Sequence, residues 1–430
     1  MNYLLLYLAV MIAVMALYLR RQRRIRNSHS AELQQSIHGG LTEPPSLHPV
    51  ADPALCMGSG ACVKACPEQA LGVVNGKAVL INAAHCIGHG ACMSACPVEA
   101  ITLVFGTEKR GVDIPNINPD FETNVPGIFI AGELGGMGLI RKAAEQGRQA
   151  MESIRKRKTE NESEFDVVIV GSGPAGISAG LSALENQLRY KILEQEVSLG
   201  GSVYHYPRQK VAMTAPVELA LLGKVGFTEV KKERLLEFWL DAVHKTGLEI
   251  AFSERMETIG KVDNAFVVHS NHGSYKTRSV LLALGRQGTP RKLDVPGEEM
   301  PKVVYRLIDP AQFQGQAVLV VGGGDSALEA AIALSEQTDT NVILSYRSAA
   351  FSRVKQKNRT ALERQQESGR LRVLLNSRVQ RILADEVDIV QDGASKRYRN
   401  DAVIVCAGGL LPTSLLKDIG INFNTKFGNA

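Results

Sequence analysis

The sequence predicts an α/β protein in which two βαβ units follow a small α+β unit and an N-terminal transmembrane helix. The prediction rests on two Gly-rich turns set between strand-like and helical runs, on a doubled cysteine motif, and on a long uncharged run near the N-terminus. With 430 residues, the chain has room for two or three domains. Apolar residues make up 45% and charged residues 22% of the chain, which excludes a disordered or fibrous protein.

The N-terminal run from Tyr3 to Leu19 contains no charged residue, no Pro and no Gly. As a helix it is about 26 Å long at ~1.5 Å per residue, which is enough to cross the hydrocarbon core of a bilayer. No basic residue precedes the run and no Ala-x-Ala site follows it, so we expect a retained single-pass anchor and not a cleaved signal peptide. A buried core helix is the alternative, and the basic residues that follow disfavour it.

The positive charges orient this anchor. Five arginines follow the apolar run: Arg20, Arg21, Arg23, Arg24 and Arg26. Positive residues favour the cytoplasmic side, so we expect an inner (cytoplasmic) membrane location with everything after Arg20 in the cytoplasm. The net charge is +5, and the chain is nearly neutral without this block, so no nucleic-acid-binding surface is implied. Residues 1–26 are therefore the expected anchor with its basic flank, and residues 27–50, which lack apolar periodicity, are the expected linker.

Six of the seven cysteines lie in two similar runs, CMGSGACVKACPEQAL from Cys56 and CIGHGACMSACPVEAI from Cys86. This distribution is typical of metal ligands and not of a disulfide framework, and it indicates a reducing compartment. The runs resemble the bacterial two-cluster ferredoxins, whose pattern is C-x2-C-x2-C-x3-C-P and whose fourth Cys binds the cluster of the other run. The resemblance implies an α+β ferredoxin domain over residues 51–106 that holds two iron–sulfur clusters.

The second cysteine of each run is replaced, by Ser59 in the first and by His89 in the second. Three outcomes stay open: a 4Fe-4S cluster with Ser59 or His89 as its fourth ligand, a 4Fe-4S cluster with an open or water-bound iron, and a 3Fe-4S cluster. Imidazole replaces thiolate in Rieske centres, so a His ligand is chemically reasonable. A zinc site is the remaining alternative, and zinc sites rarely have this doubled Cys-Pro layout. The family's crossing rule gives two ligand groups: Cys56, Cys62 and Cys96, and Cys66, Cys86 and Cys92.

The first Gly-rich turn lies between the strand-like run FDVVIV and a helical run, and a second strand-like run ends in an acid. In a G-x-G-x-x-G turn, the first Gly permits a tight turn, the second lets the backbone approach a pyrophosphate, and the third lets the helix pack on the strand. An acid at the end of the next strand accepts bonds from a ribose. Strand, turn, helix and acid together predict a dinucleotide site. The candidate binding residues are Gly171, Gly173, Pro174, Ala175, Gly176 and Glu194.

A second unit of the same kind begins with AVLVVGGGDSALEAA. The strand that follows it ends in Ser-Tyr-Arg-Ser where an acid would bind an adenosine 2′-hydroxyl. A cation at that place suits a 2′-phosphate, which Arg347 with Arg353 nearby can supply. We therefore expect NADPH in preference to NADH, the alternative being that Arg347 is a solvated charge. The other candidate binding residues are Gly322, Gly324, Asp325, Ser326 and Ala327.

Together these motifs resemble the thioredoxin-reductase-like pyridine nucleotide oxidoreductases over roughly residues 107–430. The resemblance is carried by GSGPAG at 171, LLALGR at 281, GGGDSA at 322, VIVCAGGLLPTS at 403 and TNVPGIFIAGE at 123. It implies two Rossmann-like domains, an FAD domain interrupted by an NAD(P)-binding domain. The segment at 123 is similar to the family's terminal FAD motif, which implies Gly132 and Glu133 at the flavin, with Glu133 where Asp is usual. Gly200 and Gly201 match the family's Gly-Gly near the flavin.

The order of these motifs differs from the family's. The terminal FAD motif comes last in the family, whereas here it precedes the first Gly-rich turn. The simplest interpretation is a circular permutation, which chains with adjacent surface termini tolerate. The alternative is a homodimer in which each tail completes the flavin site of the neighbour. The expected domains are the permuted FAD tail at 107–150, the FAD domain at 165–290, the NAD(P)-binding domain at 291–400 and the return to the FAD domain at 401–430.

The chain lacks the Cys-x-x-Cys that thioredoxin reductases carry ahead of the second Gly-rich strand. A dithiol relay is thereby excluded, and Cys406, in an apolar strand, is expected to pack. In this respect the chain is similar to the bacillithiol-disulfide-reductase-like and ferredoxin-NADP-reductase-like branches. No catalytic residue is assigned.

Cofactor chemistry gives the expected function. Flavin links two-electron nicotinamide to one-electron clusters, so we expect an oxidoreductase that passes electrons between NAD(P)H, FAD and the clusters to a one-electron acceptor. The expected partner is a membrane redox protein or a quinone-linked complex. The alternatives are a flavin-dependent reductase of a small disulfide or organic acceptor with structural clusters, and a membrane-tethered redox sensor.

Overall fold

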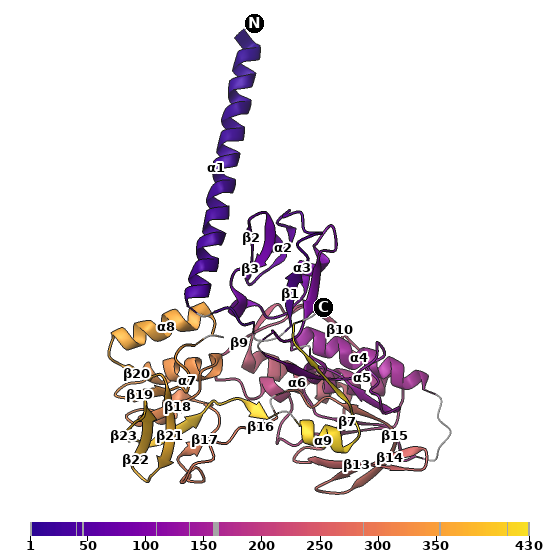
Figure 1. The fold of residues 1–430 in the computed structure, drawn as a ribbon. Helices are drawn as coiled ribbons and strands as arrows, with labels where there is room; N and C mark the ends of the chain where they lie inside the picture. The colour runs from indigo at the N-terminus through magenta and orange to yellow at the C-terminus, as the bar shows by residue number, and fades with distance from the viewer. Residues whose placement is uncertain are drawn as a thin grey trace.

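The computed structural model describes residues 2–39, 41–44, 47–108, 110–136, 138–157, 163–286, 288–351, 354–410 and 412–428. Figure 1 shows a long N-terminal helix that projects from the rest of the molecule, with a small unit beside its lower half and two larger α/β units below. We call these the cysteine unit, the first nucleotide unit and the second nucleotide unit. Their residues are given below.

The N-terminal helix α1 (Asn2–His38) is continuous over 37 residues. Its apolar side chains are exposed between Tyr7, which is 74% exposed, and Leu19. Among the side chains that the structure describes, no helix has both the length and the apolarity needed to cross a bilayer. The side chains of residues 1–6 and of residue 9, which belong to the expected anchor, lie outside the described part.

The expected linker at 27–50 is in part wrong, because α1 continues through His38 and packs against the cysteine unit. The Val73 N–H donates to His29 Nδ1 at 3.0 Å, and the Ser36 hydroxyl donates to Asn82 at 3.1 Å. These contacts are polar, so no apolar periodicity in the sequence could indicate this half of the helix.

The cysteine unit consists of two antiparallel strand pairs and two short helices. β1 pairs with β4 and β2 pairs with β3, and the β2-β3 hairpin lies between the two cysteine runs. The helices α2 and α3 follow Gly60 and Gly90, which are both left-handed. The elements are β1 (His48–Ala51), α2 (Ala61–Ala65), β2 (Leu71–Val74), β3 (Lys77–Leu80), the 3₁₀ helix η1 (Ala83–His85), α3 (Ala91–Ser94) and β4 (Ile101–Val104).

The first nucleotide unit has a sheet of order β13-β14-β15-β7-β8, and β6 pairs in parallel with β15. The helices α4 and α5 pack together, and with α6 they enclose an apolar core. Two small pairs, β9 with β12 and β10 with β11, follow β8. The elements are β6 (Ile128–Ile130), η2 (Glu133–Gly135), α4 (Ile140–Lys156), β7 (Phe165–Val170), α5 (Pro174–Glu185), β8 (Tyr190–Leu193), η3 (Gly201–Val203), β9 (Val211–Met213), β10 (Val217–Leu219), β11 (Gly223–Val225), β12 (Glu229–Lys231), α6 (Lys232–Thr246), β13 (Met256–Val262), β14 (Ala265–Ser270) and β15 (Ser274–Leu282).

Residues 107–157 complete this unit from within the same chain, through β6 and α4. β5 (Val112–Pro115) pairs with β26 (Phe423–Lys426), and the Gly428 N–H donates to the Phe105 carbonyl at 2.8 Å. The end of the described chain therefore lies beside the start of this segment, which is the arrangement that a circular permutation requires. The segment extends to the end of α4 at Lys156, beyond the expected limit at 150.

The second nucleotide unit has a parallel sheet of order β17-β24-β18-β19-β20 and a separate β21-β22-β23 meander. The boundary expected at 401 is wrong, because β24 pairs in parallel with β17 and β18 and so completes this sheet. The return to the first unit follows with β25 and α9. The elements are β16 (Thr289–Pro290), β17 (Val303–Val304), η4 (Pro310–Phe313), β18 (Ala317–Val321), α7 (Asp325–Ser335), β19 (Asn341–Ser345), α8 (Gln356–Glu367), β20 (Leu371–Leu374), β21 (Ser377–Ile382), β22 (Glu386–Gln391), β23 (Ala394–Arg399), β24 (Ala402–Val405), β25 (Gly409–Leu410) and α9 (Thr413–Asp418).

Candidate functional site

The first Gly-rich loop, between β7 and α5, is tightly packed toward the sheet. A Cβ at Gly176 would lie 1.8 Å from the Gly171 carbonyl oxygen. A Cβ at Gly171, where φ is +104°, would lie 2.5 Å from the Ala283 carbonyl oxygen. At Gly173, by contrast, the nearest atom to an added Cβ would be the Gly201 Cα at 3.8 Å. The loop is therefore closed toward the sheet and freer toward Gly201.

The Glu194 carboxylate holds this loop from below. It is 5% exposed, and its Oε2 accepts bonds from the Ser172 N–H at 2.7 Å and the Ser172 hydroxyl at 2.8 Å. Its Oε1 accepts from the Glu196 N–H at 2.9 Å. A carboxylate has about four acceptor positions, so one remains for a ribose hydroxyl. The ribose contact stays a prediction, and the support of the loop is a second role that the sequence did not indicate.

A glycine pair closes over the same loop from the other side. The N–H of Gly200, where φ is +112°, donates to the Ser172 carbonyl at 2.9 Å. A Cβ at Gly201, where φ is +53°, would lie 3.0 Å from the Gly173 Cα. Side chains are thus excluded where a pyrophosphate needs close approach of the backbone. These residues fit a dinucleotide such as FAD.

The segment after β6 forms another wall of this site. The Gly132 N–H donates to the Gln146 side chain at 2.9 Å, and a Cβ at Gly132 would lie 3.1 Å from the Ala175 Cβ. Burial raises the pKa of the Glu133 carboxyl, and Arg286 opposes that rise. Burial also lowers the pKa of Arg286. A half-buried acid and a half-buried base therefore influence each other beside the Gly-rich loop, where the family resemblance implies the flavin.

Polar side chains of both nucleotide units meet at the loop after Gly201. Arg306 approaches His205 Nδ1 at 2.5 Å, and burial, followed by Arg306, lowers the pKa of His205. Lys210 forms an ion pair with Glu329 at 2.9 Å. Burial and nearby carboxylates raise the pKa of Tyr206. This loop of the first unit is therefore in direct contact with the second.

The second Gly-rich loop, between β18 and α7, is more open at its second motif glycine, Gly324. Gly324 is exposed, and a Cβ there would meet nothing within 4 Å. The ring of Tyr346 lies directly on the loop, because a Cβ at Gly323 would be 2.1 Å from it. Tyr346 also stacks on Phe351, with ring centroids 5.2 Å apart and planes 10° from parallel. An aromatic surface beside a Gly-rich turn suits a flat base.

The predicted nicotinamide-site residues differ in their surroundings. Asp325 is bound within the protein, because its Oδ1 accepts from the Lys355 N–H at 2.9 Å and from Asn358 at 2.8 Å. Ser326 is exposed, and so is Arg347, just beyond the end of β19. The remaining members are Ala327, which is buried beside Gly322, and Arg353, which lies outside the described residues. The NADPH preference stays a prediction.

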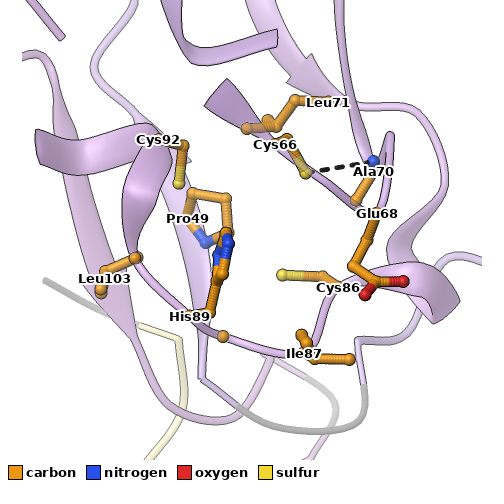
Figure 2. Close-up of a pocket in the computed structure, with 12 residues that line it drawn as sticks. Pro49, Cys66, Glu68, Ala70, Leu71, Cys86, Ile87, His89, Cys92 and Leu103 are labelled. Atoms are coloured by element: carbon orange, nitrogen blue, oxygen red, sulfur yellow. Dashed lines mark hydrogen bonds between the residues drawn. The ribbon is translucent and has the colours of Figure 1, made fainter. Parts of the chain in front are cut away.

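One group of cysteines lines a cavity in the cysteine unit together with His89. Figure 2 shows the sulfur atoms of Cys66, Cys86 and Cys92 turned toward a common space, with the His89 ring at its edge. The three cysteines come from both runs. The structure therefore brings together the group that the crossing rule implies. We call this the His89 site.

The other group, Cys56, Cys62 and Cys96, lines a second cavity with Ser59. The Ser59 hydroxyl accepts a bond from the Ala61 N–H at 3.5 Å. This cavity, which we call the Ser59 site, again combines two cysteines of one run with one of the other. Each site thus offers three thiols and one oxygen or nitrogen donor.

The thiols of both sites are shielded from water and hydrogen-bonded. Burial raises the pKa of the Cys62 and Cys92 thiols, and it raises that of Cys86 to about 11, with the charge of Glu68 acting in the same direction. Iron must displace these protons to bind the thiolates. Backbone N–H groups of Ala70, Ala78 and Ala100 donate at 3.3–3.4 Å to the sulfurs of Cys66, Cys56 and Cys96, respectively.

The donor set fits an iron–sulfur cluster. Within the described residues, no three His, Cys, Asp or Glu side chains are placed to hold one metal ion directly. A cluster places iron and sulfide atoms between its thiolates, so its ligands stand farther apart than those of a single ion. Three thiols around a cavity, with N–H donors to the sulfurs, meet that requirement.

Three residues at these sites were missed by the sequence reasoning. Glu68 lines the His89 site, and Tyr346 covers the second Gly-rich loop. Arg286 ends the LLALGR motif, yet nothing in that motif indicates its pairing with Glu133. Position in the cysteine repeat could have indicated Glu68, because Val98 takes the same place in the other run. Cys406 is partly buried and packs against the apolar core of the second unit, as predicted, and burial raises its pKa to about 12.

Two families match the chain. The family described as "Pyridine nucleotide-disulphide oxidoreductase" matches residues 168–428, and the family described as "4Fe-4S dicluster domain" matches residues 48–97.

Curated relatives include two ferredoxin–NADP reductases. The Thermus thermophilus protein is 30% identical over 60% of this chain and 76% of its own length. The Streptococcus sanguinis protein is 29% identical over 42% of this chain, and the match spans only 53% of that relative.

Solved structures show a similar fold. The bacillithiol disulfide reductase Bdr of Staphylococcus aureus has a TM-score of 0.55 at 24% identity, over 61% of this chain and 82% of that one. The Bacillus cereus Bdr has a TM-score of 0.54 at 22% identity, over 60% and 82%. At these identities the likeness concerns the fold alone.

Proposed function

We propose a function from one premise: the chain belongs to the pyridine nucleotide-disulphide oxidoreductase family and carries a 4Fe-4S dicluster domain. The protein is a membrane-anchored NAD(P)H oxidoreductase that serves a one-electron acceptor. Bound FAD would exchange hydride with the nicotinamide and single electrons with the iron–sulfur clusters. The names of the ferredoxin–NADP reductase relatives support electron transfer between NADP and an iron–sulfur protein, here present in the same chain.

One observation carries this proposal: the cysteine unit is in direct contact with the turn that begins at Glu133, which forms one wall of the candidate flavin site. Two residues after Leu103, which lines the His89 site, the Phe105 ring packs on the backbone of Gly136. A Cβ at Gly136 would lie 2.4 Å from that ring. Gly136 ends the short turn that begins at Glu133. This contact supports a permuted chain in which the His89 site would lie near the flavin site through a few covalently linked residues.

The residues of the first nucleotide unit would hold the flavin and exclude water from it. The absence of side chains at Gly173 and Gly201 would let a pyrophosphate approach the backbone, and Glu194 fixes the loop through Ser172. The half-buried Glu133 and Arg286, which act on each other electrostatically, lie at the same wall. In the second unit, the exposed Arg347 would bind the 2′-phosphate of NADPH.

Membrane attachment is part of the proposal and rests on α1. Its described apolar side chains are exposed, and the five arginines that follow are exposed as well. An exposed apolar helix flanked by cations suits insertion into a bilayer with an anionic inner surface. The acceptor would then be a membrane redox protein or a quinone-linked complex on the cytoplasmic side. Extraction of native membranes with alkaline carbonate tests this: retention in the pellet supports the anchor, and release contradicts it.

An anaerobic titration with NADPH tests the electron path. We expect the flavin absorbance to bleach first and the cluster absorbance to follow. A flavin that is fully reduced beside clusters that stay oxidised would contradict the proposal. A comparison of kcat/KM for NADPH with that for NADH tests the coenzyme preference.

A further inference from the structure

Besides the replaced cysteines, the two runs differ in charge at one position that faces a cluster site in both. The first run continues from Cys66 as Pro-Glu, and the second continues from Cys96 as Pro-Val. Glu68 and Val98 therefore occupy equivalent places in the repeat. Glu68 lines the His89 site, and Val98 lines the Ser59 site. The repeat has placed a carboxylate at one site and an apolar side chain at the other.

Glu68 lies close to the thiolate positions of the His89 site. It is half-buried, and Figure 2 shows it next to Cys86, on the opposite side of the cavity from Cys92. The Ser59 site has Val98 and Ile101 in its wall, with no carboxylate among its described lining residues.

A fixed negative charge beside a cluster opposes the addition of an electron, because reduction makes the cluster more negative. Net charge is one of the factors that set the reduction potentials of iron–sulfur clusters. Reduction of either site adds one electron and changes no covalent bond. On the proposed function, the electron originates from NADPH.

We propose that Glu68 is a potential-tuning residue that lowers the reduction potential of the cluster at the His89 site and leaves that of the cluster at the Ser59 site unchanged. The inference rests on the proposed function only in assuming that both sites hold clusters.

The two sites also face different parts of the molecule. A difference in their reduction potentials would therefore favour electron transfer in one direction between them. The His89 site faces the nucleotide units: the Gln356 N–H donates to the ring of His85 at 3.2 Å, one residue before Cys86. The Ser59 site borders the exposed side chains of Leu55 and Met57, 53% and 69% exposed. A lower potential at the inner site favours residence of the electron at the outer, exposed site.

Three variants of the full-length protein test this. Glu68→Gln removes the charge with little change in shape, Val98→Glu introduces it at the equivalent place, and Val98→Gln is the uncharged control. The midpoint potentials of both clusters are measured by EPR-monitored redox titration, and iron and sulfide contents are measured in parallel. We expect Glu68→Gln to raise the potential of one cluster, and Val98→Glu to lower the potential of the other relative to Val98→Gln.

Unchanged potentials in Glu68→Gln, or equal shifts of both clusters, would overturn the inference. If Glu68→Gln loses iron, the test rests on Val98→Glu. A potential of the Ser59-site cluster that is lower than in Val98→Gln supports the inference. The same potential in both variants overturns it. A wild-type protein that binds no clusters would overturn the proposed function as well. Intact clusters with unmoved potentials would overturn this inference alone.

Discussion

The two Gly-rich loops share a motif, yet the structure treats them differently. At the first, Gly201 closes over the second motif glycine, Gly173, because a Cβ at Gly201 would lie 3.0 Å from the Gly173 Cα, and Glu194 is buried beneath the loop. At the second, Gly324 has open space around it and Arg347 is exposed. An enclosed site suits a cofactor that stays bound, and an open site suits a coenzyme that must enter and leave in each turnover. The residues around each loop, and not the shared motif, therefore distinguish a site for a bound cofactor from a site for an exchanging coenzyme.

The largest effect is expected from Gly176→Ala, because the new methyl group would overlap the Gly171 carbonyl oxygen. Overpacking of this kind costs about 1–3 kcal/mol, and here it also displaces the loop that would hold the pyrophosphate. We expect the purified protein to lose most of its flavin, measured as the amount of FAD released by denaturation per amount of protein. Full flavin content in this variant would contradict the enclosed first site.

A smaller effect is expected from Glu194→Gln. The amide nitrogen cannot accept a bond, so it would leave a donor of Ser172 or Glu196 unsatisfied. Leaving a buried donor unpaired costs about 1–3 kcal/mol, so flavin should bind about tenfold more weakly. Equilibrium dialysis of free FAD against the variant measures this. Wild-type affinity would show that Glu194 does not support the loop.

At the open site, Arg347→Ala should weaken the binding of NADPH without affecting the binding of the flavin. Loss of a charge-assisted bond to phosphate costs about 1.5–3 kcal/mol, so the KM for NADPH should rise about tenfold or more. The KM for NADH should stay the same, because NADH lacks the 2′-phosphate. Arg347→Lys, which keeps the charge, is the matched control and should recover part of the affinity. Equal losses for both coenzymes would contradict the assignment.

The smallest effect is expected from Gly324→Ala, at the position that corresponds to Gly173 in the first loop. Its Cβ would meet nothing within 4 Å, and its φ of −102° is ordinary for any residue. We expect the free energy of unfolding to change by less than about 0.5 kcal/mol and the flavin content to stay at the wild-type level. Thermal unfolding of the two alanine variants side by side measures the contrast. A loss as large as that of Gly176→Ala would remove the distinction between the loops.

Features that depend on local motifs could be predicted from the sequence, whereas features that depend on tertiary contacts could not. The spacing of the glycines places both loops, and the repeat groups the cysteines, since each feature depends on neighbouring residues. The lower half of α1 is missed because its contacts, such as that of His29 with Val73, are polar and distant in sequence. The boundary near 401 is missed because only strand pairing shows to which sheet β24 belongs. The contact of Tyr346 with Gly323 likewise forms only in the fold.

The central claim is that one chain carries electrons from NAD(P)H to its own clusters. Stopped-flow mixing of the oxidised protein with NADPH, under anaerobic conditions and at several protein concentrations, tests it most directly. We predict that cluster bleaching follows flavin bleaching at a first-order rate that does not change with protein concentration. Clusters that stay oxidised, or that are reduced at a rate proportional to protein concentration, would contradict the claim.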